Sequence, residues 1–174
     1  HLLSNSLGNV CYQCHKDEEK RFKEGMSIHT PVAKGECTAC HKPHASPLGR
    51  LLSKTGKDLC YSCHQKEEEL FKKAYVHQPV REGECLICHD PHSSENAKQV
   101  REKVPSLCLN CHDVQEQKFK VAHLTYPVEK KNCLTCHDPH ASDTAWLPRQ
   151  EIHPPVAEKM CDTCHQPPQS AEPF

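Results

Sequence analysis

The sequence predicts a mostly irregular fold, in which a few short α-helices recur along the chain and little or no β-sheet forms. Only 36% of the 174 residues are hydrophobic and 5% are aromatic, so side chains alone would build a thin core. Fourteen prolines favour turns over long regular elements. Fourteen cysteines with one repeated spacing indicate that something besides apolar side chains fills the interior.

Every cysteine belongs to a Cys-x-x-Cys-His motif, and this motif occurs seven times. The cysteine pairs are Cys11 and Cys14, Cys37 and Cys40, Cys60 and Cys63, Cys85 and Cys88, Cys108 and Cys111, Cys133 and Cys136, and Cys161 and Cys164. The closing histidines are His15, His41, His64, His89, His112, His137 and His165. This motif is the attachment signature of c-type haem, in which two thiols bond the porphyrin and the histidine binds the iron from the proximal side. The sequence therefore predicts seven haem c groups, which would also supply the missing core volume.

Zinc sites, disulfide frameworks and iron–sulfur clusters also use closely spaced cysteines. Neither a zinc site nor a disulfide framework requires a histidine directly after every cysteine pair. Iron–sulfur clusters use cysteine thiolates at other spacings. Seven motifs that consume every cysteine therefore favour covalent haem.

The motifs alternate between two types, and one motif of each type forms a repeat. First-type motifs, which end at His15, His64 and His112, lead into charged stretches with a phenylalanine seven residues later: Phe22, Phe71 and Phe119. Seven residues are two helical turns, so we expect three short helices there, with the phenylalanines packed against haem faces. Second-type motifs continue into x-Pro-His. We expect one domain over 1–174, with repeats at about 1–49, 50–97 and 98–145 and a partial fourth at 146–174.

Seven further histidines recur in register with the motifs, one for each predicted haem. Four stand shortly before a Pro-Val pair and three follow a second-type motif: His29, His77, His123 and His153, and His44, His92 and His140. Haem iron commonly takes histidine as an axial ligand, so bis-histidine coordination is expected throughout. The two methionines, Met26 and Met160, do not recur, and His1 falls outside the pattern.

The pairing of proximal and distal histidines stays open in the sequence. We expect each histidine before Pro-Val to serve the second-type haem shortly downstream, so that His29 serves the haem of His41. The histidines after second-type motifs would then serve first-type haems, either in their own repeat or in the next. In the first case one chain supplies both axial ligands of all seven haems. In the second, His140 is spare and could bind the His15 haem of a neighbouring chain, and such head-to-tail contacts build filaments.

The paired motifs, the Cys-His-Asp-Pro-His sequences and the upstream His-x-Pro-Val resemble the doubled-CXXCH family of multihaem cytochromes, from His1 to about Gln166. The chain is also similar in style to small periplasmic multihaem carriers and filament-forming extracellular cytochromes. The resemblance implies respiratory electron transfer in the periplasm or outside the cell, with redox proteins or extracellular acceptors as partners. The fourth repeat departs from the pattern, because it lacks a first-type motif and a histidine after its second-type motif.

Other classes of function are disfavoured. A net charge of −1 argues against a nucleic-acid partner, and no apolar run reaches the length of a membrane span. The chain begins with His1 rather than Met, so we expect a processed product or a part of a larger cytochrome. We expect an electron carrier rather than an enzyme of the nitrite or hydroxylamine type, because such an enzyme needs an open iron position.

Overall fold

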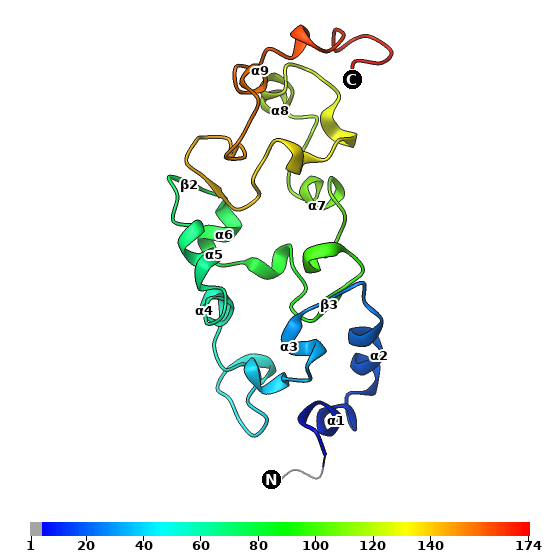
Figure 1. Cartoon of the computed structure of the whole chain (residues 1–174), viewed down its shortest axis with the longest axis vertical. Coiled ribbons are helices and arrows are strands. Elements are labelled where there is room, and N and C mark those ends of the chain that lie inside the picture. Colours follow the sequence, from blue (N-terminus) through cyan, green and yellow to red (C-terminus); the bar gives the residue numbers. More distant parts are fainter. Residues whose placement is uncertain (1–4) are drawn as a thin grey trace. The chain divides into compact units, whose positions relative to one another are not determined.

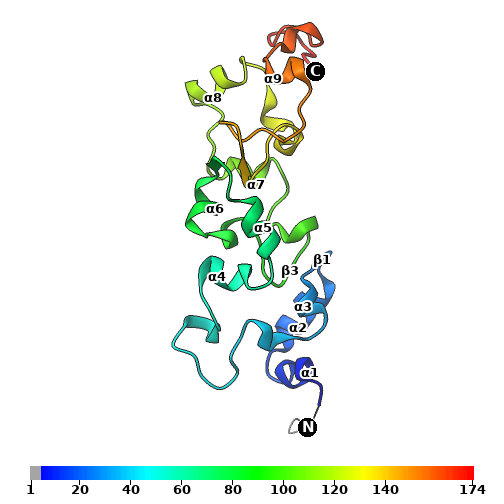
Figure 2. The ribbon, with the colours of Figure 1, turned by 60° about the vertical axis from the view of Figure 1, so that its left-hand side comes forward.

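The computed structural model describes residues 5–174 and confirms the predicted fold class, with short helices joined by irregular chain (Figures 1 and 2). His1 lies outside the described residues. The chain divides into two compact units. Unit 1 comprises His1–Leu70 and Gln78–Glu102, and unit 2 comprises Phe71–His77 and Lys103–Phe174.

The helices of unit 1 are all shorter than three turns. The α-helices are α1 (Leu7–Tyr12), α2 (Lys16–Glu24), α3 (Thr30–Ala33), α4 (Gly56–Tyr61), α5 (Gln65–Leu70) and α6 (Gln78–Glu82). The 3₁₀ helices are η1 (Cys37–Ala39), η2 (Gly49–Leu51), η3 (Cys85–Ile87) and η4 (Ala97–Gln99). In unit 2 the helices are α7 (Ser106–Leu109), α8 (Gln117–Ala122), α9 (Pro154–Ala157), η5 (Val128–Lys130), η6 (Cys133–Thr135) and η7 (Cys161–Thr163).

The three helices predicted after first-type motifs are confirmed as α2, α5 and α8. In α2 the first turn carries acidic side chains and the last turn carries the basic Arg21 and Lys23. This order of charge complements the helix dipole and helps to stabilise a short helix that has no fully buried side chain.

Two strand pairs, each two residues long, are the only sheets in the described part of the chain. In unit 1, β1 (Ser27–Ile28) lies side by side with β3 (Ser93–Ser94) in antiparallel register (Figure 2). In unit 2, β2 (Tyr75–Val76) pairs in the same way with β4 (Ala141–Ser142). Each pair joins a segment before a Pro-Val histidine to the segment after a second-type motif, so the strands position the histidines on either side.

Few side chains are buried among the described residues. The only buried hydrophobic residues there are Tyr126 and Ala141, and the buried polar ones are Ser93 and Ser142. Backbones also approach closely: a Cβ added at Gly8 would lie 3.0 Å from the Cα of Gly35, which has a φ of +70°. The predicted thin side-chain core is therefore confirmed.

Candidate haem-binding sites

Each Cys-x-x-Cys-His motif forms one helical turn. In all seven, the backbone N–H of the histidine donates to the carbonyl of the first cysteine at 2.9–3.1 Å. Both thiols and the imidazole therefore project from a single turn of backbone. None of the fourteen cysteines forms a disulfide, and none is fully buried. This is the donor set that covalent haem attachment requires, and the residues present fit the group.

Four pairs of imidazole rings lie opposite each other at one recurring distance. A ring nitrogen lies about 2.0 Å from a bound metal and roughly 1.1 Å from its ring centroid, so two imidazoles across one iron place their centroids about 6.2 Å apart. The four pairs have centroid distances of 6.0–6.1 Å: His29 with His64, His41 with His92, His77 with His112, and His123 with His137. Each pair contains one motif histidine and one histidine from outside the motifs.

Three of these pairs differ from the expected local pairing. His29 faces His64 of the next repeat, whereas the sequence suggested His41. His41 instead faces His92, which was expected to serve a first-type haem. His77 and His112 repeat the His29–His64 arrangement. Only the His123–His137 pair has the local arrangement that the sequence analysis expected.

Backbone carbonyls fix the orientation of six imidazoles. The Nδ1 atom lies 2.8–3.0 Å from a backbone carbonyl oxygen in His29, His41, His77, His89, His123 and His137. A carbonyl only accepts, so Nδ1 carries the proton and donates, which leaves Nε2 as the metal-binding nitrogen. Burial lowers the pKa of His92 and of His112 and so favours the neutral ring that binds iron.

The recurring phenylalanines pack against imidazoles. Phe22 stacks on His92 with a centroid distance of 4.5 Å and an interplanar angle of 16°. Phe71 stacks on His140 in nearly the same geometry, at 4.6 Å and 18°. Phe119 lies 4.3 Å from His123 at a tilt of 35°. Each phenylalanine thus contacts a candidate distal ligand from one side, while its packing against a haem face stays a prediction.

Attachment cysteines from neighbouring motifs lie close together in unit 1. A hydrogen bond between the Cys60 and Cys85 thiols raises the pKa of Cys60 and lowers that of Cys85 to about 6. Burial and then the neighbouring Cys11 raise the pKa of Cys37. The first cysteines of the two motifs in a repeat are therefore neighbours, so the two porphyrin edges bonded to them would also lie close.

Four histidines of the predicted set have no imidazole opposite them within residues 5–174. They are the motif histidines His15 and His165 and the candidate distal ligands His44 and His153. His165 has aromatic neighbours, with centroids 6.4 Å from Tyr126 and 5.0 Å from Phe174, both nearly edge-on. His89 and His140 do not belong to this open set, because both make further contacts in the described chain.

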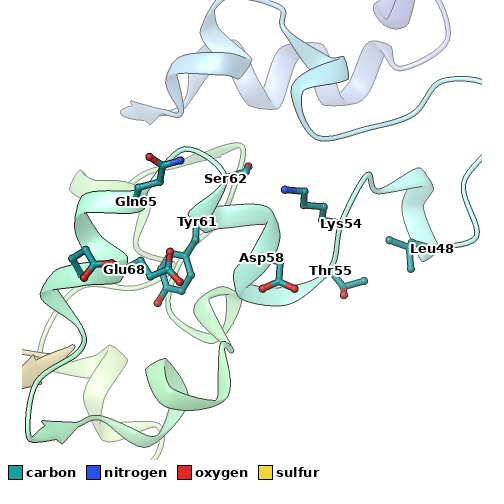
Figure 3. A pocket seen from close by; sticks show the side chains of 9 residues that line it. Leu48, Lys54, Thr55, Asp58, Tyr61, Ser62, Gln65 and Glu68 are labelled. Carbon is teal, nitrogen blue, oxygen red and sulfur yellow. The ribbon is translucent and has the colours of Figure 1, made fainter.

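An open hollow of about 900 Å³ lies on unit 1 (Figure 3). Its lining includes Asp58, Tyr61 and Glu68, and none of the candidate haem ligands lines it. Among the described residues no cluster of three or more His, Cys, Asp or Glu could hold a bare metal ion. The imidazoles occur in pairs, which suits an iron whose other four ligands come from a porphyrin.

No described helix has both the length and the apolar character that crossing a membrane demands. No curated protein matches the chain. A family model described as the doubled CXXCH motif matches residues 29–69, 77–117, 126–151 and 153–174. These matches cover most of the sequence and include six of its seven attachment motifs. The chain therefore belongs to the doubled-CXXCH family of multihaem c-type cytochromes.

Proposed function

We propose that the protein carries electrons along seven bis-histidine haem c groups. The observation that carries this proposal is the set of four imidazole pairs at 6.0–6.1 Å, the distance that two axial ligands of one iron require. Haem supplies a one-electron iron couple when bound. The chain's own residues set the axial ligands, hold each Nε2 toward its partner and keep neighbouring attachment points together.

Paired imidazoles favour a carrier over an enzyme. When His41 and His92 occupy both axial positions, no site remains on that iron for nitrite, hydroxylamine or another substrate. The close attachment thiols of Cys60 and Cys85 bring two porphyrin edges within reach of each other, which favours transfer of electrons from ring to ring. Electron transport is thus the activity that this arrangement of ligands suits best.

Membership of the family supports a proposal for the cellular site and the partners. Covalent haem attachment in this family implies maturation outside the cytoplasm, so we place the protein in the periplasm or at the cell surface. Its partners would be redox proteins or extracellular electron acceptors. Copies of the chain could also join head to tail, because neighbouring repeats already share axial ligands, as His29 and His64 do.

The test of bis-histidine ligation is a single-ligand variant. His29→Ala should convert one of the seven haems from low spin to high spin in electron paramagnetic resonance spectra, because His64 loses the imidazole opposite it. Met26→Ala is the matched control, since Met26 lies three residues away and is 74% exposed. An unchanged low-spin signal in His29→Ala would contradict the proposed ligation.

A further inference from the structure

We propose that the fourth repeat of one copy docks on the first repeat of a second copy and that the two copies exchange axial ligands. His153 would bind the haem of His15 in the second copy. His44 of the second copy would bind the haem of His165. This inference rests on the proposed bis-histidine function, and it specifies the partner that completes the two open sites.

The junction between consecutive repeats is seen inside unit 1. Strand β1 pairs with β3, and the N–H of His29 donates to the carbonyl of His92 at 2.9 Å. The Nδ1 of His29 donates to the carbonyl of Pro91 at 3.0 Å. Across this junction His29 faces His64, and His92 faces His41. One junction therefore completes two imidazole pairs with ligands that cross in opposite directions.

Unit 2 contains a second copy of the same junction. Strand β2 pairs with β4, and the N–H of His77 donates to the carbonyl of His140 at 2.9 Å. The Nδ1 of His77 lies 2.9 Å from the carbonyl oxygen of Pro139, and His77 faces His112. The two junctions agree in their strand pairing, in both hydrogen bonds of the Pro-Val histidine and in the motif histidine that it faces, so they define a rule for how one repeat binds the next.

The chain also contains one further copy of each of the two segments that form this junction, and neither copy is paired within the described chain. Glu151-Ile152-His153-Pro154-Pro155-Val156 corresponds to Ser27-Ile28-His29-Thr30-Pro31-Val32, and Pro43-His44-Ala45-Ser46 corresponds to Pro91-His92-Ser93-Ser94. His153 has φ and ψ of −60° and 132°, and His29 has −65° and 134°. The Ser46 hydroxyl donates to the Leu52 carbonyl at 2.6 Å, as that of Ser94 donates to Val100. Both halves therefore already have the conformation that the junction uses.

Several residues of these two segments are more exposed than their counterparts in the observed junctions. Ser93 and Ala141, which lie inside the two observed junctions, are 8% and 3% exposed. The corresponding Ala45 is exposed, and so is His44 beside it. His153 is exposed, whereas His29 and His77 are only partly so. A second copy would cover the same surfaces that a neighbouring repeat covers within the chain.

Among the described residues, two candidate distal ligands, His44 and His153, have no motif histidine opposite them, and two motif histidines, His15 and His165, have no distal ligand. The number of unused ligands therefore equals the number of incomplete haem sites. In the observed junctions, the Pro-Val histidine of one repeat faces the first-type motif of the next, as His29 faces His64. The same rule assigns His153 to His15 of a second copy. It assigns the second copy's His44 to His165, as His92 is assigned to His41. The sequence analysis named His140 as the histidine that could bind the His15 haem of a neighbouring chain. In this proposal His153 binds that haem instead, and His44 of the second copy binds the haem of His165.

Such a contact is heterologous, because the fourth repeat binds the first. Each added copy again exposes one Pro43–Ser46 segment and one Glu151–His153 segment, so growth into a filament is possible unless the rotation closes a ring. The haem series would continue from copy to copy with the ligand sharing seen within the chain.

The test separates docking from ligation. Ala45→Arg places a large charged side chain on an exposed position that the junction would bury, and it alters no histidine. Gly49→Arg is the matched control, because Gly49 has open space around it and Ala97, its counterpart beside an observed junction, is exposed. The holoprotein is examined by light scattering, negative-stain microscopy and carbon monoxide binding to the ferrous form.

The native protein and Gly49→Arg should form head-to-tail assemblies that bind almost no carbon monoxide. Ala45→Arg should be monomeric and should bind two molecules per chain, at the haems of His15 and His165. A native monomer in which all seven haems resist carbon monoxide would overturn the proposal, as would assembly of Ala45→Arg. His29→Ala tests the underlying function separately, because its lost ligand lies within one chain and does not depend on assembly.

Discussion

Replacing Phe22 by leucine should weaken one iron–histidine bond by a predictable amount. Phe22 stacks on His92 at 4.5 Å, and His92 faces His41. Stacked aromatic pairs contribute about 0.5–1.5 kcal/mol beyond their buried area, and leucine keeps most of the volume while removing the ring. At about 1.36 kcal/mol per factor of ten, the affinity of His92 for the iron should fall about 2- to 13-fold.

Carbon monoxide competes with the distal imidazole for ferrous iron and so reports this change. One haem per chain of Phe22→Leu should bind carbon monoxide at a concentration about 2- to 13-fold lower than in the native protein. Arg21 also lies over the Phe22 ring at 4.8 Å, so the variant removes a second interaction.

A double-mutant cycle with His92→Ala isolates the stacking contribution. Without His92 the phenylalanine has no axial ligand to support, and Phe22→Leu should then leave carbon monoxide affinity unchanged. Equal effects of Phe22→Leu in the native and His92→Ala backgrounds would refute the proposed support of the ligand.

Three further outcomes follow from the same structure. His77→Gly should open one carbon monoxide site at the haem of His112, and millimolar imidazole should close it again, because the ring it replaces faces His112. Gly8→Ala should lower the free energy of unfolding in guanidinium by about 1–3 kcal/mol, since its Cβ would lie 3.0 Å from Gly35, whereas Gly49→Ala meets nothing within 4 Å and should be neutral. Isoelectric focusing should place the holoprotein below the polypeptide value of about 7.0, because haem propionates add negative charge; focusing at 7 would contradict seven haems.

Sequence reasoning succeeded where the signal was local. The attachment motif specifies one turn of backbone, and that turn recurs from His15 to His165 with the same hydrogen bond. The helices after first-type motifs follow from heptad spacing and charge order, as in α2. The fourteen prolines and the low hydrophobic content correctly indicated a fold with almost no sheet.

Sequence reasoning failed where the pairing depends on contacts between repeats. His29 is only eight residues before Cys37, yet the carbonyl of Pro91 holds its Nδ1 and directs the ring to His64. No local spacing encodes that long-range hydrogen bond. His123 is different, because its Nδ1 donates to Phe119 within its own helix turn. Its distance from Cys133 is ten residues, compared with eight from His29 to Cys37.

The phenylalanines show the same limit. The seven-residue spacing placed Phe22 correctly on a helix and Phe71 directly after one, but it could not identify what these two rings contact. The partner of each ring is a histidine some 70 residues away, brought there by pairing of two-residue strands. Such short strands have no periodicity to detect.

The central claim is that every Cys-x-x-Cys-His motif carries a covalent haem with two histidine ligands. Intact mass measurement of the native protein, combined with magnetic spectroscopy of the same sample, tests it most directly. The mass should exceed the 19.8 kDa polypeptide by roughly 4 kDa, and the ferric haems of the four observed imidazole pairs should all be low spin. A mass equal to that of the polypeptide, or high-spin iron at those four sites, would contradict it.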